Sequence, residues 1–141
     1  MTFKYAEPAI FELVQALASG NAFWLAAPPN QAAPFIVYQG VDSDTFGKNV
    51  LNRTAGQAGT VQAYIQIDCY GITPAVSKEL AKAVESTLDG YSGTVYHGTD
   101  SPQDSVVIGG ISLQNDVDIV DRTDEPLLFR NSAVYLVTYN Q

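Results

Sequence analysis

The residue types that could do chemistry gather in Tyr96-His97-Gly98-Thr99-Asp100-Ser101, which holds the single histidine of the chain. Histidine, aspartate and serine are the types of a nucleophilic triad, but a triad depends on spatial geometry that closeness in sequence does not supply. The surrounding residues 91–106 are rich in Gly, Ser and Asp and are predicted to form a loop. A loop is a poor support for a preorganised site. We therefore predict no catalytic residue and no enzyme.

Metal and cofactor signals are also poor. One histidine and one cysteine cannot build a structural zinc site. Asp116-Val-Asp118-Ile-Val-Asp121 has calcium-loop spacing but lacks the glycine and final glutamate of an EF-hand, and its interleaved apolar residues favour a strand with solvent-facing carboxylates. Gly109-Gly110 has neither the lysine of a phosphate loop nor dinucleotide spacing, and it indicates a bend or bulge in a strand. No metal and no cofactor are predicted.

Composition places further limits on function. The 141 residues, 46% of them hydrophobic, predict one domain spanning 1–141. The net charge is −8 with only 7 Lys and Arg and no basic run, which argues against capture of nucleic acid through its phosphates. The lone Cys69 has no disulfide partner in the chain. Residues 1–8 lack a signal-peptide pattern, and no apolar run reaches membrane-spanning length, so we expect synthesis in a cytoplasm and no membrane partner.

The elements that must position any functional residue begin with a helix over 8–18, where Ile10, Leu13, Val14 and Leu17 share one face. A proline-rich connection leads to a strand over 35–41. Phe23 to Leu25, before it, fit a short strand or an apolar plug. Residues 42–59 are polar and are predicted to be a long loop, or in part a hairpin whose flanking strands pair antiparallel.

The strand over 61–70 alternates strictly, which predicts two distinct faces. Its core face carries Val61, Ala63, Ile65, Ile67 and Cys69, and its other face carries Gln62, Tyr64, Gln66, Asp68 and Tyr70. A helix from the N-cap Thr73 to Gly90 follows, with an apolar stripe that includes Leu80, Val84 and Leu88.

Strands over 107–120 and 127–139 close the chain. The order of helices and strands is not a regular βαβ alternation. We therefore predict an α+β fold: a mostly antiparallel sheet of four to five strands, two helices packed on one face, and a long loop between strands.

Several ordered features carry a resemblance to a known family. An early helix precedes Pro34-Phe-Ile-Val-Tyr-Gln39, and a variable loop leads to Val61-Gln-Ala-Tyr-Ile-Gln-Ile-Asp-Cys-Tyr70. A helix ending Ala83-Val-Glu-Ser-Thr-Leu-Asp-Gly90 follows, and the acidic Asn115-Asp-Val-Asp-Ile-Val-Asp121 comes before a final strand. In this order the chain resembles the tail-terminator (tail-completion) proteins of long-tailed bacteriophages and prophages.

The resemblance implies a non-catalytic virion structural protein that forms a ring, commonly a homo-hexamer, on the completed tail tube. Such a ring ends tube polymerisation and presents the head-attachment surface. Its partners would be the tail tube protein and a head-completion or connector protein, with DNA passing through the lumen without specific binding. It implies a place at the head-proximal end of the tail in the virion, after assembly in the bacterial host cytoplasm.

The subunit or tail-tube interface is predicted on the polar-aromatic face of the strand over 61–70 and on the loop before it, since a ring needs two different surfaces of one subunit. The candidate residues are Phe46, Lys48, Asn49, Arg53, Gln62, Tyr64, Gln66 and Tyr70.

Two alternatives stay open at this point. The first is a head-completion or connector adaptor, which has a similar size and also forms rings. The second is a small cytoplasmic ligand-binding domain or enzyme with a pocket between the sheet and the helices.

Overall fold

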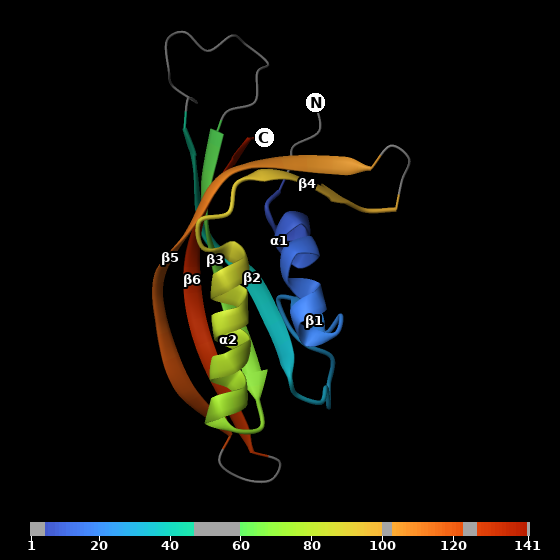
Figure 1. The fold of residues 1–141 in the computed structure, drawn as a ribbon, viewed down its shortest axis with the longest axis vertical. Helices are drawn as coiled ribbons and strands as arrows, with labels where there is room; N and C mark the ends of the chain where they lie inside the picture. The colour runs from blue at the N-terminus through green and yellow to red at the C-terminus, as the bar shows by residue number, and fades with distance from the viewer. Residues whose placement is uncertain (1–4, 47–59, 100–102, 123–126, 141) are drawn as a thin grey trace, which may run out of the picture.

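The computed structural model describes residues 5–46, 60–99, 103–122 and 127–140 (Figure 1). Within these ranges the elements are α1 (Glu7–Val14), a 3-10 turn η1 (Gln15–Ala18), β1 (Ala22–Trp24), β2 (Phe35–Phe46), β3 (Thr60–Gly71), α2 (Pro74–Leu88), β4 (Gly93–His97), β5 (Asp104–Arg122) and β6 (Leu128–Asn140). Neither α-helix in the described ranges has the length and apolar character needed to cross a membrane.

The sheet confirms the α+β prediction but corrects its strand count. Six strands pair in the order β1-β2-β3-β6-β5-β4, and β1 runs parallel to β2 whereas the other pairs are antiparallel. The short strand predicted as one possibility for Phe23 to Leu25 is found as β1, and the strand missed in the count of four to five is the edge strand β4. Strands of 3 and 5 residues are too short for a clear alternation of apolar residues.

The predicted loop over 91–106 is also corrected. It contains β4 and the start of β5, which form an antiparallel pair with His97 opposite Asp104. Asp100 and Ser101 lie outside the described residues. Glycine and serine hid the strand character of this hairpin, since both residue types are typical of turns.

The core lies between the helices and one face of the sheet, and both helices pack on that same face (Figure 1). Every residue of the predicted core face of β3, from Val61 to Cys69, is buried, as are Leu80, Val84 and Leu88 of α2. Burial raises the pKa of the Cys69 thiol to about 12, so the thiol stays protonated and inert.

Local signals fix the start of α2. The side chain of Thr73 accepts a hydrogen bond from the Val76 amide at 3.1 Å, which is the predicted N-cap. Pro74 follows at the first helical position, where a missing amide hydrogen does no harm. The predicted helix over 8–18 is found as α1 followed by the η1 turn.

The segment predicted as a loop over 42–59 is partly strand. β2 continues to Phe46, which lies opposite Thr60 of β3, and a register shift lies between Gly40 and Asp42. The two strands pair antiparallel, as expected for a hairpin. Residues 42–45 are polar but still pair with β3, so hydrophobic alternation could not show this extension. Lys48, Asn49 and Arg53 lie outside the described residues.

β5 bends where the glycine pair predicted it. Its register against β6 shifts between Ile108 and Gly110 and again between Leu113 and Asn115. Figure 1 shows β4 and the first part of β5 crossing near α1, while the rest of β5 runs beside β6. Residues 115–121 lie in this strand, which confirms the strand interpretation of the acidic segment.

Candidate interaction surface

The sheet face opposite the helices is the candidate site, and we call it the outer face (Figure 1). No described helix packs on it. The central strands contribute Gln62, Tyr64, Gln66, Asp68 and Tyr70 from β3 and Arg130, Ser132, Val134, Leu136 and Thr138 from β6. The four predicted residues of β3, Gln62, Tyr64, Gln66 and Tyr70, share this face because side chains alternate along a strand.

One half of the outer face is open. Tyr64 lies directly opposite Leu136 in the β3–β6 register, and Gln62 lies opposite Thr138. All four side chains are only partly buried. A tyrosine beside an aliphatic side chain, with polar neighbours, is the mixture that protein interfaces favour.

In the other half, aromatic side chains of the same chain pack on one another. The ring of Tyr70 stacks on Phe35 with centroids 4.5 Å apart, and Phe23 meets Phe35 edge-on at 6.4 Å. Val37 on the same face of β2 is buried. Tyr70, a predicted contact residue, is therefore already packed within the subunit.

An ionic network lies beside this aromatic cluster. Arg130 Nη1 is 3.6 Å from Asp68 Oδ2, and Arg130 Nε is 3.3 Å from Asp121 Oδ1. The Nε group is buried and, among the described residues, its pairing with Asp121 lacks hydrogen-bond geometry. Gln66 donates to both Asp68 carboxylate oxygens at 3.2 and 3.1 Å. Burial and the Asp68 charge raise the pKa of the Tyr70 hydroxyl, whereas Arg130 opposes the rise.

Sequence reasoning placed Asp68 on this face but missed its partner Arg130, which also pairs with Asp121. The available signal was that Asp68 is the single charged residue of an otherwise neutral strand, which requires a cation if it is buried. The pairing of Tyr70 with Arg130 across β3 and β6 supplies that cation. This register cannot be read from either strand alone.

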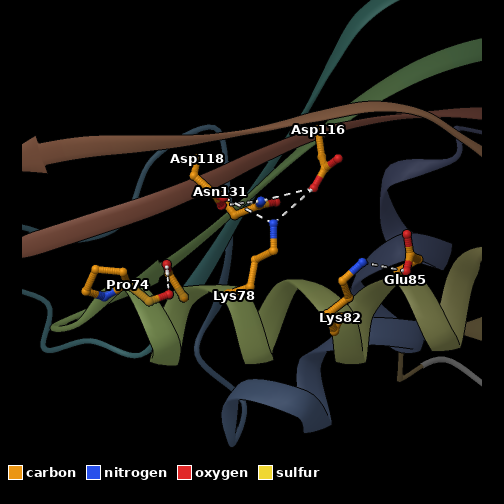
Figure 2. Close-up of polar contacts among 8 residues, drawn as sticks. Pro74, Lys78, Lys82, Glu85, Asp116, Asp118 and Asn131 are labelled. Atoms are coloured by element: carbon orange, nitrogen blue, oxygen red, sulfur yellow. Dashed lines mark hydrogen bonds and ion pairs between the residues drawn. The ribbon is translucent and has the colours of Figure 1, made fainter.

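A second polar cluster lies on the helix side of the same β5–β6 hairpin (Figure 2). Lys78 of α2 reaches across to β5, with its Nζ 3.1 Å from Asp118 Oδ2 and 4.0 Å from Asp116 Oδ2. Asn131 donates to Asp118 Oδ1 at 2.8 Å and to Asp116 Oδ2 at 3.2 Å. The acidic segment faces solvent only in part, because two of its carboxylates are held from α2 and β6.

The contacts of this second cluster lower the pKa of one carboxyl group, that of Asp118. The hydrogen bond from Asn131 and then the one from Lys78 hold the pKa of the Asp118 carboxyl below its usual range. Asn131 itself is buried, and its Oδ1 has no hydrogen-bond partner among the described residues. Within the same residues, no three histidine, cysteine, aspartate or glutamate side chains gather in a way that could hold a metal ion.

No protein-family model matches the chain, and no curated protein matches it. A solved structure does share its fold. It is a chain from a structure described as the virion of a native gene transfer agent (GTA) particle, with a TM-score of 0.53 and 16% sequence identity. The match covers 92% of this chain and 85% of that chain. At this identity the likeness establishes a common fold across nearly the whole domain.

Proposed function

We propose that this protein is a virion structural protein of a phage or phage-like particle, in which it forms a ring that caps the tail tube. The ring ends tube polymerisation and offers the surface to which the head attaches. The observation that carries the proposal is the fold shared with a chain of a virion particle over most of both chains. The chain acts by assembly and has no catalytic role.

The outer face supports a contact between subunits. A closed ring requires that two different surfaces of one subunit meet. Tyr64 and Leu136 offer a partly exposed apolar centre with Gln62 and Thr138 beside it. Burial of such a centre within a polar rim is typical of specific protein interfaces. We assign this half of the outer face to the neighbouring subunit or the tail tube.

The charge of the chain is compatible with a lumen through which DNA passes. With a net charge of −8, the subunit offers little attraction to phosphate. The proposed partners are further copies of the chain, the tail tube protein and a head-completion or connector protein, at the head-proximal end of the tail.

A charge placed at the open half of the outer face tests the contact. Tyr64→Glu would bury a carboxylate in the interface, and we expect it to prevent ring formation, measured by light scattering with and without tail-tube ends. Tyr96→Glu is the matched control, because Tyr96 is 61% exposed on edge strand β4. Rings of normal size from Tyr64→Glu would contradict the assignment.

The capping role is tested in tails assembled without this protein. Loss of a terminator gives tubes of abnormal length in negative-stain images. The alternative, a head-completion or connector adaptor with the same shared fold, predicts tails of normal length that do not join heads. A third possibility, a small ligand-binding domain or enzyme, predicts a rise in melting temperature with one compound of a metabolite library.

A further inference from the structure

β5 leaves part of its backbone without a partner strand. It runs over 104–122, but β4 pairs only with Asp104 to Ile108. The next stretch is covered by the end of α2, since the Gly90 amide donates to the Ile111 carbonyl at 2.8 Å and the Leu113 amide donates to Asp89 Oδ1 at 3.0 Å. Over 114–122, no strand of the described chain pairs with this edge. An unpaired edge of this length is a template for another strand.

The direction of the free backbone groups follows from the same contacts. The Ile111 carbonyl and the Leu113 amide point away from β6, because their partners lie on the other side. Along an antiparallel ladder this direction recurs at every second residue. The register shifts between Leu113 and Asn115. Beyond this shift, the backbone groups that point away from β6 belong to Asp116, Asp118 and Val120. In the register these three residues lie opposite Ala133, Asn131 and Phe129.

A recess lies next to this edge, between β5 and the first turns of α2. Its volume is about 420 Å³, and its walls include Pro74, Ala75 and Lys78 of α2 and Asp118 and Val120 of β5. Val120 is 56% exposed. A strand added to the edge would direct alternate side chains toward this recess, because successive side chains point to opposite faces.

Charge indicates the chemistry of the added strand. Asp116 and Asp118 share the single ammonium of Lys78, so the pair keeps an excess negative charge, and the Asp118 side chain is 61% exposed (Figure 2). A second copy of this chain offers a poor complement. The described strands contain no lysine, their arginines are Arg122 and Arg130, and Arg130 is held by Asp68 and Asp121.

We propose that the edge of β5 over 114–122 and the adjoining recess bind an extended segment of a different protein, in which lysine or arginine alternates with apolar residues. The backbone of that segment extends the sheet. Its lysine or arginine side chains point to the helix side, where their stems enter the recess and their charged ends face Asp116 and Asp118. Its apolar side chains point to the other side of the sheet, beside Val117, which is 55% exposed. Ladder bonds supply affinity and the recess supplies specificity. The site uses the edge of β5 and not Tyr64 or Leu136 of the central strands, so it goes beyond the proposed ring contact and does not depend on it.

The probe is a fluorescent peptide of roughly nine residues, long enough to span the edge, with lysine and valine alternating. We expect saturable binding by fluorescence anisotropy. Ala75→Trp fills the recess from an exposed helix position and is expected to weaken binding about tenfold or more. Ser86→Trp is the matched control, because Ser86 is an exposed residue of α2 that does not line the recess.

Two modified peptides and one further variant distinguish binding by strand addition from binding by charge attraction alone. A peptide with glutamate in place of lysine is expected not to bind. A lysine–valine peptide N-methylated at every backbone amide keeps its charge but cannot donate to the ladder from either edge, and it is also expected to lose binding. Val120→Pro removes one amide hydrogen from the open edge and should act in the same direction.

Several results would overturn the proposal: no saturable binding, equal affinity of the Ala75→Trp and Ser86→Trp variants, or equal affinity of the methylated peptide. Tyr64→Glu keeps this test distinct from that of the ring, because it should disturb assembly and leave peptide binding unchanged. The ring contact and the peptide site can therefore each be refuted without affecting the other.

Discussion

The two polar clusters of the β5–β6 hairpin use adjacent residues of β6 on opposite sheet faces. Arg130 joins Asp68 and Asp121 on the outer face, whereas Asn131 joins Asp116 and Asp118 on the helix side. They differ in how the ionic groups meet water. The side chain of Asp68 is 7% exposed and that of Arg130 is 26% exposed, against 61% for Asp118 and 46% for Lys78.

This difference in burial gives the clusters different roles. A carboxylate removed from water needs its cation, since an unpaired buried charge is costly. An exposed pair gains little, because water and salt screen both charges. The outer cluster therefore holds β3 and β6 in register, while the helix-side ammonium can exchange partners and leave Asp118 available to another cation.

The largest effect on stability is expected from the removal of the Arg130 guanidinium, the cation of the outer-face cluster. Arg130→Met keeps most of the side-chain volume but leaves Asp68 buried without a positive partner. We expect the free energy of unfolding to fall by about 2 to 4 kcal/mol, below the full cost of breaking a buried pair because Arg130 is partly exposed. Urea denaturation measures this. Arg130→Lys should recover part of the loss, and a fall under about 0.5 kcal/mol would refute the contrast between the clusters.

An intermediate effect is expected at Asn131, the buried member of the helix-side cluster. Asn131→Ala removes the hydrogen bonds to Asp116 and Asp118 and should lower the free energy of unfolding by about 1 to 2 kcal/mol. Ser132→Ala, at the next position on the outer face, is the control and should change little. If the two variants lose equal stability, the buried amide does not organise the cluster.

The smallest effect on stability is expected at Lys78. Lys78→Met should destabilise the fold less than Asn131→Ala does, and added salt should reduce the difference from the unchanged protein. The pKa of the Asp118 carboxyl should rise toward its ordinary value, which NMR titration of the carboxyl carbon measures.

The sign of the pH dependence follows from the lowered pKa of Asp118. Its contribution to stability is fully present above the unfolded value of about 3.9 and is lost as the pH falls through the lower folded value. Lys82→Met is the matched control, because Lys82 acts on Asp118 only weakly and pairs with Glu85 at 3.4 Å. Equal shifts of the Asp118 pKa in the two lysine variants would show that the contact at 3.1 Å has no special weight.

Much of the scaffold could be predicted from local pattern. The alternation from Val61 to Tyr70 assigned both faces of β3 correctly, and the Thr73 cap placed the start of α2. The glycine pair at 109–110 marked the bend in β5. Each of these features depends on residues near one another in the chain. The short β4 was missed in the count because its stability comes from the neighbouring strand rather than from its own composition.

The candidate site was predicted only in part. The face that carries Gln62, Tyr64, Gln66 and Tyr70 was identified, but the stacking of Tyr70 on Phe35 was not. The assignment of these residues to a subunit interface stays a prediction. The recess beside α2 could not be predicted from the sequence, since its walls come from three separate elements, α2, β5 and β6.

The sequence by itself determined which side chains share a face, because a strand turns successive residues to opposite sides and a helix repeats about every 3.6 residues. It thereby determined an apolar face for the helices and a polar-aromatic face opposite. Only the tertiary structure decided that β6 lies between β3 and β5. That order brings Arg130 to Asp68, gives Lys78 two carboxylates and leaves one edge of β5 open. Strand order follows from packing the whole chain around one core, which no local pattern encodes.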